Sequence, residues 1–420
     1  MSTRHSSAPP RAGLLLLLLA PCASVAAEEY WGYAYRNIQV TAAGTSAYAV
    51  ELAHHLVRLD AVVTEALGIK TAYRMPTHIY AVPRAQLVPF LGDHATSSYQ
   101  ISSYDNTILM DNYLGSDARY RYWNAYFGYI GALLLSDGSL RRPYWYRVGV
   151  PEVFADAVFE GNRVKTGSVS SGVHMALLGG ALIPMRTFLA LTKSQVESRG
   201  ERYRALYDAE SWYVARQIFV EQRHRSEFMQ YLALMDQGTS EPDAFAGSFK
   251  TTYEELDREL VEARVTPAHV YLMQAPGEAA GDRGTAQRLS AAEVKGRLAL
   301  LSLGHRRGPD ALQLAREALQ AEPTNESALR ALARAQFARG AYNDALAAVD
   351  SLAAHGSSPV ALADSAAVLA GLARAVADGQ ATLPVDAATL KQRARDAYQR
   401  AIAADGEDRR SRDALAALDR

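Results

Sequence analysis

The sequence predicts an α+β domain over roughly the first two thirds of the chain and an all-α helical solenoid over the last third. Two observations separate these parts. All four Trp residues lie before residue 280, and so do all 23 Tyr residues except Tyr342 and Tyr398. Residues 281–420 instead contain 38 Ala, and small residues recur there every 34 positions. We therefore expect a domain boundary near residue 280.

The composition of the 420 residues excludes several classes of protein. Lys and Arg number 44 against 45 Asp and Glu, so the chain lacks the basic excess that is typical of nucleic-acid-binding proteins. A single cysteine, Cys22, excludes an intrachain disulfide and a thiolate metal site. Hydrophobic residues make up 49% of the chain and charged residues 21%, which is ordinary globular usage.

Residues 1–27 resemble a signal peptide. Arg4 and Arg11 supply positive charge, Leu14 to Leu19 form an apolar run, and small residues continue to Ala27. That run is too short to span a membrane, and no later stretch approaches the ~18 apolar residues that a spanning helix needs. We expect an exported protein, periplasmic or secreted, with no transmembrane helix after signal removal.

A second interpretation of the same segment is a lipid anchor. The residues Leu19-Ala20-Pro21-Cys22 loosely resemble a bacterial lipoprotein box, in which lipidation of Cys22 would hold the protein at the outer membrane. Proline directly before the cysteine fits that box poorly, so cleavage near Ala27 is the favoured prediction.

Residues 28–275 mix the periods of strands and helices. Ile38 to Val40 and Thr77 to Val82 have the pattern of strands, and the latter ends at Pro83. Between them, Ala47 to Leu67 has helical spacing and Gly68 supplies a C-terminal stop. A short hairpin is predicted over 99–110. Helical patterns follow at about 118–135, 149–160, 206–221, 223–236 and 250–264. This order predicts an α+β domain without alternating βαβ units.

A linker over 276–290 leads into the predicted repeats, residues 291–420. Ala299 and Ala333 lie 34 positions apart, and so do Ala311 and Ala345. A 34-residue period with small residues at helix contacts is typical of tetratricopeptide repeats. Such arrays bury the apolar face of each unit against its neighbour and offer a concave surface to a protein or peptide partner. A generic Ala-rich helical bundle is the alternative.

The first domain contains no familiar catalytic motif. It has no Gly-x-Ser-x-Gly elbow and no glycine-rich phosphate loop before a helix. None of the ten His residues has a second His four positions away, so the sequence contains no His-Glu-x-x-His zinc helix. His54 and His55 are adjacent and point ~100° apart on a helix, which prevents them from holding one ion. We predict no metal and no cofactor.

The stretch from Tyr120 to Gly161 points to a family. Its first half is a helix that is apolar almost all round, as buried helices are, and Pro143, Trp145, Gly149 and Glu152 follow. These residues resemble the gluzincin-type metallopeptidases of the peptidase MA-like group. That family places His-Glu-x-x-His on a buried helix and a third zinc ligand, a Glu, in a later Pro-x-Trp-x-x-Glu-Gly segment. The resemblance covers roughly residues 34–265 and implies a zincin-like fold for residues 28–275.

The zinc ligands of that family are missing from this sequence. The stretch that matches His-Glu-x-x-His is Phe127 to Gly131, or Tyr126 to Ile130 in the adjacent register, and Val148 stands at the third ligand. None of these side chains replaces the ligands or the Glu that activates water. The resemblance therefore implies a degenerate domain with no catalytic residue and a remnant cleft. The residues predicted to line it are Tyr126, Phe127, Gly128, Tyr129, Gly131, Val148, Glu152, Tyr207 and Trp212.

An ordinary hydrophobic core is the alternative interpretation of this aromatic cluster. The glycines Gly128 and Gly131 each cost about 1 kcal/mol inside a helix relative to Ala. Their presence indicates that something large packs against the helix at those positions.

Three functions are compatible with these observations. The leading hypothesis is an exported pseudopeptidase that acts as a scaffold and binds a protein or peptide through its repeats and its remnant cleft. The first alternative is a hydrolase with an unrecognised site built from Glu152, Asp156, Tyr207 and Glu210, because carboxylates with perturbed pKa values can act as acids and bases. The second alternative is a structural component of a cell-envelope assembly.

Overall fold

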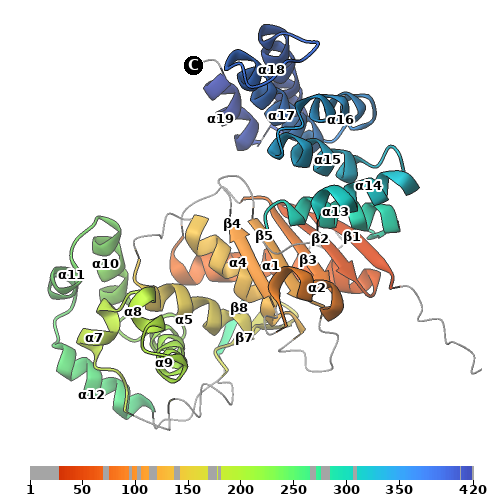
Figure 1. The fold of residues 1–420 in the computed structure, drawn as a ribbon. Coiled ribbons are helices and arrows are strands. Elements are labelled where there is room, and N and C mark those ends of the chain that lie inside the picture. The colour runs from red at the N-terminus through yellow and green to blue at the C-terminus, as the bar shows by residue number, and fades with distance from the viewer. Residues whose placement is uncertain are drawn as a thin grey trace, which may run out of the picture.

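In the computed structural model, a mixed α/β domain at the N-terminal end is followed by a mostly helical region (Figure 1). The predicted signal peptide and Cys22 lie outside the described residues. The structure describes residues 28–69, 75–93, 97–101, 106–112, 121–136, 142–168, 177, 181–264, 271–275, 284–305, 310–406 and 408–418.

A six-stranded sheet forms the centre of the N-terminal domain. Its strands are β1 (Tyr30–Tyr35), β2 (Ile38–Ala43), β3 (Thr77–Val82), β4 (Ser97–Ile101), β5 (Asn106–Asp111) and β9 (Gln287–Leu289). They lie in the order β4-β5-β3-β2-β1-β9. The pairs β2–β3 and β3–β5 are parallel, whereas β4, β1 and β9 pair antiparallel with their neighbours. The predicted strands and the hairpin are confirmed.

Helix α1 (Ser46–Leu67) connects two parallel strands, β2 and β3. The domain therefore contains a βαβ unit at this point, which the predicted order without βαβ alternation did not include. A 22-residue helix is long enough to return the chain to the start of a parallel neighbour, which a tight turn cannot do. The Thr45 hydroxyl accepts a hydrogen bond from the Tyr48 N–H at the start of α1. Gly68 ends it in the left-handed conformation, with φ of 65°, as predicted.

The two faces of the sheet have different chemistry. Ile38, Ile79 and Ile108 lie on one face and join the main hydrophobic core with α1 and α4 (Trp123–Ser136). The other face carries polar residues at the alternate positions of the same strands. Helices α2 (Arg84–Leu91) and α13 (Ala291–Ser302) cover part of it, where Tyr80, Leu87, Phe90, Leu109, Val294 and Leu301 form a second apolar cluster.

The main core extends from the sheet into a set of helices. Helix α5 (Tyr144–Ala155) packs against α4 and against α9 (Glu201–Phe219). The remaining elements of this part are β6 (Val158–Glu160), β7 (Arg163–Thr166), β8 (Tyr271–Gln274), α7 (Met185–Ala190), α8 (Lys193–Glu197), α10 (Arg225–Asp236), α11 (Glu241–Ser248) and α12 (Tyr253–Arg264). The strands β6, β7 and β8 form a small antiparallel sheet.

The helix predicted over 149–160 is wrong at both ends. It begins at Tyr144, because Pro143 occupies the position before the first turn, where a missing N–H costs nothing. It ends at Ala155, and residues 158–160 instead form strand β6, which pairs with β7. The helices predicted over 206–221, 223–236 and 250–264 are confirmed to within a few residues as α9, α10 and α12.

Helix pairs make up the C-terminal region. They are α13 with α14 (Ala311–Ala321), α15 (Glu326–Ala338) with α16 (Tyr342–His355), and α17 (Pro359–Ala377) with α18 (Ala387–Ala404), followed by α19 (Arg409–Leu418). We call this region the helical array. The first helices of successive pairs touch at residues 34 apart. The Ser327 hydroxyl donates to Glu293 (3.0 Å), and Arg330 Nε donates to Asp364 (2.8 Å).

The predicted linker, residues 276–290, contains part of the sheet. Its residues 287–289 are strand β9, which pairs with β1, and Ser290 then caps α13 through a hydrogen bond from the Glu293 N–H. The helical array is therefore attached directly to the edge of the sheet, and Figure 1 shows α13 beside the strands.

Helix α17 meets the length and composition expected of a membrane-spanning helix. This corrects the sequence expectation that no later stretch does so. Within the array α17 packs against α15, α16 and α18, and 61% of its most apolar window is buried. It also carries the buried, ion-paired Asp364. These contacts account for its apolar composition as that of a core helix in the array.

The crossing of α5 over α9 depends on Gly149. A Cβ atom there would lie 2.0 Å from the Ser211 carbonyl oxygen, which belongs to rigid helix backbone. We expect Gly149→Ala to lower the free energy of unfolding of this domain by about 3 kcal/mol through overpacking. Urea unfolding followed by Trp fluorescence measures the loss, because the four Trp residues all lie in this part of the chain.

Gly284→Ala is the matched control for this experiment, because a Cβ there makes only an ordinary contact, 3.6 Å, with the Tyr33 ring. Equal effects of the two substitutions would contradict the close crossing.

Candidate functional site

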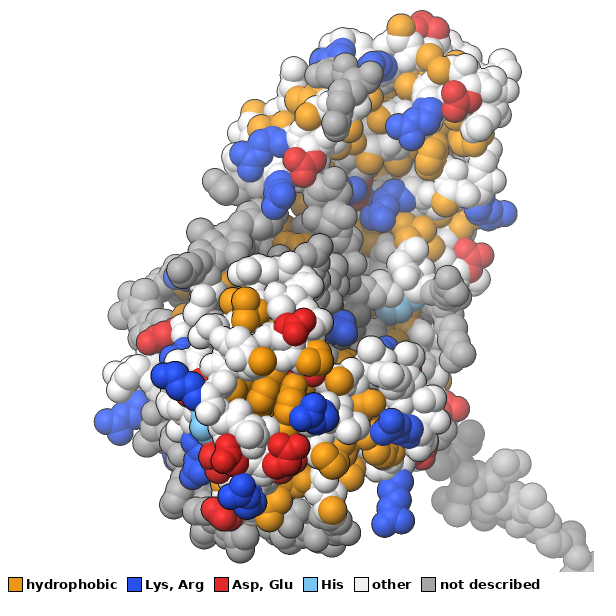
Figure 2. Space-filling model, turned by 90° about the vertical axis from the view of Figure 1, so that its left-hand side faces the viewer, with side chains coloured by type: hydrophobic (Ala, Val, Ile, Leu, Met, Phe, Trp, Pro, Cys, Tyr) orange, Lys and Arg blue, Asp and Glu red, His pale blue; other side chains and the backbone are white. Residues whose placement is uncertain are grey.

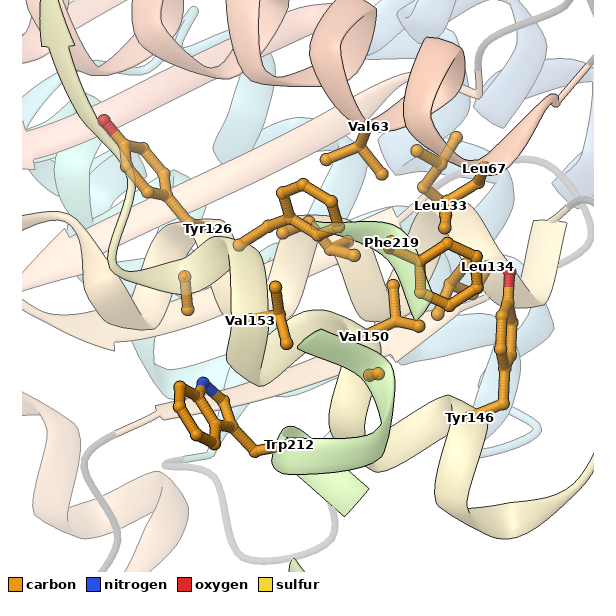
Figure 3. Packing of buried hydrophobic residues seen from close by; sticks show 14 of the residues in the cluster. Val63, Leu67, Tyr126, Leu133, Leu134, Tyr146, Val150, Val153, Trp212 and Phe219 are labelled. Carbon is orange, nitrogen blue, oxygen red and sulfur yellow. The ribbon is translucent and has the colours of Figure 1, made fainter. Parts of the chain in front are cut away.

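The residues of the predicted remnant cleft lie on three helices of the main core. Figure 3 shows Tyr126 of α4, Val150 and Val153 of α5, and Trp212 of α9 in one packed cluster. Tyr126, Tyr129, Tyr207 and Trp212 are all buried there. A hydrophobic core, the alternative interpretation, therefore describes the aromatic members of this set. None of the nine residues lines the cavity described below.

Helix α4 presents tyrosine hydroxyls to α1. The Tyr129 hydroxyl donates to Asp60 (3.1 Å), and the Tyr126 hydroxyl lies 2.9 Å from His55 Nδ1. Tyr122, one residue before α4, donates to Glu51 in the same way (2.8 Å). These bonds satisfy polar groups that would be costly to bury alone. The stretch that matches His-Glu-x-x-His thus serves to join two helices.

The other α4 positions of the set are also packing positions. The Phe127 ring stacks on Trp123 with 5.1 Å between centroids, and Gly131 is buried. A Cβ at Gly128 would meet Ile108 of β5 at 3.1 Å. The large neighbour that the sequence indicated for Gly128 is therefore a side chain of a sheet strand.

Two half-buried members of the set, Val148 and Glu152, lie on α5. Burial, with a smaller contribution from the negative charge of Asp208 on α9, raises the pKa of Glu152 to about 7. Burial also raises the pKa of Asp208. Beside them the Tyr207 ring stacks on Tyr144 with 5.5 Å between centroids. Glu152 and Asp208 therefore form a carboxylate pair that titrates closer to neutral pH than ordinary side chains do.

The other carboxylates of the hydrolase alternative have structural partners. Asp156 accepts hydrogen bonds from the Thr166 hydroxyl (3.1 Å) and from the backbone N–H groups of Gly167 (3.0 Å) and Ser168 (2.6 Å). Glu210 is fully buried and accepts from the Ile183 N–H at 2.8 Å. Each carboxylate therefore anchors a different loop. Among the described residues, no group of three or more His, Cys, Asp or Glu side chains is arranged to hold a metal ion.

A cavity of about 530 Å³ lies between the polar face of the sheet and the helical array. We call it the interdomain cavity. Its volume is within the range of sites for small ligands and short segments. Its lining comprises Gln39, Thr41, His78, Tyr80, Gln100 and Thr107 from the sheet, and Glu293, Arg297, Leu300, Leu301, Gly304, Glu326, Ser327, Arg330, Arg334, Ser358, Pro359, Val360 and Asp405 from the array.

The sheet wall of the cavity is a polar row that crosses four strands. Gln100 pairs with Thr107, Thr107 with His78, and His78 with Gln39, so these side chains lie side by side on β4, β5, β3 and β2. At the strand spacing of about 4.8 Å, the row is about 14 Å long. Every member offers both a donor and an acceptor, although His78 does so only in its neutral form.

The helix wall is held to the sheet by two hydrogen bonds. Arg297 of α13 donates to the Thr41 hydroxyl (2.8 Å) and also pairs with Glu293 (2.6 Å). Gln100 donates to the Gly304 carbonyl at 3.0 Å. Farther along the array, Arg330 and Arg334 of α15 line the cavity one helical turn apart. Both walls are polar, so the cavity suits a ligand with many hydrogen-bonding groups.

Two signals in the sequence could have indicated this cavity. Gln39 and Thr41 alternate with buried apolar residues in β2, and His78 and Tyr80 do so in β3. Central parallel strands are ordinarily apolar on both faces, so a polar alternation there is informative. The charged pair Arg330 and Asp364 also follows the 34-residue period, which the sequence analysis considered only for small residues.

Comparison with known proteins gives no assignment, since no family model, curated protein or solved structure matches the chain. On the face drawn in Figure 2, positive and negative side chains are interspersed over both parts of the molecule. The candidate site therefore rests on the geometry of the interdomain cavity.

The raised pKa of Glu152 has a consequence for stability. The folded state holds this proton up to pH about 7, whereas the unfolded chain releases it near 4.3, so folding is penalised increasingly from pH 4.5 to 7. We expect Glu152→Gln to leave the free energy of unfolding at pH 4.5 nearly unchanged and to raise it at pH 8 by about 1–2 kcal/mol, because solvent partly screens the half-buried side chain.

Urea unfolding at the two pH values measures this difference. Glu262→Gln, at an exposed position of α12, is the control. A pH profile of Glu152→Gln parallel to that of the wild type would show that Glu152 is not buried as described.

Proposed function

We propose that this protein is an exported, non-catalytic binding protein that holds an extended segment of a protein partner in the interdomain cavity. The observation that carries the proposal is the cavity itself, with a polar row of the sheet on one side and the first helices of the array on the other. An extended peptide has a donor and an acceptor at nearly every residue, and the polar row offers both kinds of group over about 14 Å. The length corresponds to about four extended residues.

The fold assignments that accompany this proposal are a tetratricopeptide-type array and a zincin-like N-terminal domain. For the array, the support is the 34-residue offset of its contacts. This offset separates Glu293 from Ser327 and Arg330 from Asp364, which are hydrogen-bonded pairs. It also separates Phe337 from Gly371, where a Cβ atom would lie 2.3 Å from the Phe337 ring. For the N-terminal domain, the support is the packing of α4 against α5, the two helices that carry the resemblance.

The non-catalytic part of the proposal rests on α4, whose tyrosines are bonded to α1. Metal analysis of the purified protein tests it directly. We expect substoichiometric zinc and no effect of a chelator on any residual proteolysis. Stoichiometric zinc whose removal also removed a proteolytic activity would overturn the pseudopeptidase assignment.

The binding proposal predicts a response to filling the cavity. An array of random ten-residue peptides is probed with the labelled full-length protein and with Thr107→Trp and Gln39→Trp, which place indoles in the polar row. We expect the wild type to retain a subset of peptides and both variants to lose at least nine tenths of that signal, because a bulky ring occupies the space of the ligand.

Thr187→Trp, at an exposed position of α7 outside the cavity, should bind the same peptides as the wild type. Circular dichroism checks that the variants keep their helical content. If the wild type retains no peptide, or if the cavity variants retain the same peptides, the proposed function is wrong.

A hydrolase remains the second candidate, and the carboxylate pair Glu152 and Asp208 favours it, because such pairs are suited to acid–base chemistry near neutral pH. If the protein turns over any peptide of the array, Glu152→Gln should abolish that turnover. Unchanged turnover in this variant would eliminate the pair as a catalytic site.

A further inference from the structure

An ion cluster centred on one buried carboxylate forms part of the array wall of the interdomain cavity. Asp364 of α17 is 1% exposed and contacts three arginines. Arg330 Nε of α15 lies 2.8 Å from its carboxylate, Arg410 of α19 lies at 2.9 Å, and Arg334 of α15 at 3.9 Å. Three guanidinium groups thus surround one carboxylate, and two of them, Arg330 and Arg334, also line the cavity.

The cluster carries excess positive charge. Burial alone would raise the pKa of Asp364, but the attraction of Arg330, Arg410 and Arg334 outweighs it and holds the pKa well below its ordinary value. Asp364 is therefore ionised at neutral pH and neutralises one of the three positive charges. Hydrogen bonds to this buried carboxylate hold Arg330 and Arg410 in position, and Arg334 lies close enough to be attracted to it.

The carboxylates of the cavity lining lie mostly in other contacts. Glu293 is paired with Arg297 and accepts from Ser327. Glu326 accepts from the backbone N–H groups of Ser357 (3.2 Å) and Ser358 (3.3 Å). Asp405, at the end of α18, is the third carboxylate of the lining. Arg297 therefore has a carboxylate of its own, whereas Arg330 and Arg334 share one buried carboxylate, Asp364.

The two arginines have the geometry of an anion site. They lie four residues apart on α15, on one face and about 6 Å apart along the helix axis. Arg330 uses Nε, one of five N–H donors, for its hydrogen bond to Asp364. The Arg334 side chain is 41% exposed. A guanidinium group can bind a carboxylate through two parallel N–H donors, a geometry that lysine lacks.

We propose that the interdomain cavity selects acidic peptide segments, with Arg330 and Arg334 binding a Glu or Asp side chain while the polar row contacts the peptide main chain. Asp364 is a positioning residue that orients both arginines. This inference rests on the proposed function and names the class of partner, a protein with an exposed, extended acidic segment.

The peptide array described above also tests this inference. Among peptides whose binding is lost in Thr107→Trp, we expect Glu and Asp to be enriched at least threefold over their frequency in the library. For one such peptide, replacing its acidic residues with Gln or Asn should weaken binding measured by fluorescence anisotropy at least tenfold. The difference should shrink as salt is raised, because ions screen partly exposed charges.

Arg334→Gln and Arg334→Lys are the decisive variants, since Arg334 makes the longest of the three contacts with Asp364 and its replacement leaves Arg330 and Arg410 bonded to that carboxylate. We expect Arg334→Gln to remove most of the preference for acidic peptides and Arg334→Lys to keep only part of it. Arg316→Gln, on an exposed position of α14 outside the cavity, should behave as the wild type.

The failures of the two proposals are distinguishable. If cavity-dependent peptides are found but show no acidic enrichment, or if Arg334→Gln keeps the full preference, the inference is overturned and the binding function stands. If no peptide depends on the cavity, the proposed function and this inference fall together.

Discussion

The attachment of α13 to the sheet determines the arrangement of everything beyond residue 290. Strand β9 adds to the edge of the sheet beside β1, and Ser290 starts α13 immediately afterwards. Val294 and Leu301 then bury their side chains against Phe90 and Leu109. Burial of each such side chain contributes about 1.5–3 kcal/mol, which is more than a surface ion pair provides. The array therefore grows from a fixed first helix.

A close approach at Gly32 makes this attachment possible. A Cβ atom there would lie 2.8 Å from a methyl group of Leu289 and 3.4 Å from the Arg297 guanidinium. Without a side chain at Gly32, Arg297 reaches the Thr41 hydroxyl and ties α13 to the strand that carries Gln39. The interdomain cavity exists because this contact fixes one end of the array while the later helices diverge from the sheet (Figure 1). A ligand that touches both walls would strengthen the same attachment, since binding stabilises the state it prefers.

The sequence predicted the local elements well and their long-range arrangement less well. The periodicity of residues 47–67, the stop at Gly68 and the strand over 77–82 are local patterns, and all are confirmed. The strand 287–289 was assigned to a linker, because three residues without alternation become a strand only through pairing with β1, 255 or more positions away. The same limit hid the candidate site. Gln39, His78 and Thr107 are unremarkable in sequence, and only the register of three strands places them in one row.

The buried face of α4 carries tyrosine hydroxyls where the zinc helix of the metallopeptidases that the sequence resembles carries metal ligands. A zinc helix must direct imidazoles toward open space, whereas α4 directs the Tyr126 and Tyr129 hydroxyls toward His55 and Asp60 of α1, and Tyr122, just before α4, bonds to Glu51. Each contact satisfies a donor and an acceptor at once, so this face has its polar groups paired within the core. The interdomain cavity differs in that its polar row faces a volume of about 530 Å³ instead of a neighbouring helix. Gln39 and Thr107 of this row line that space, and we therefore propose the cavity as the site of recognition and assign a structural role to the helix that carries the resemblance.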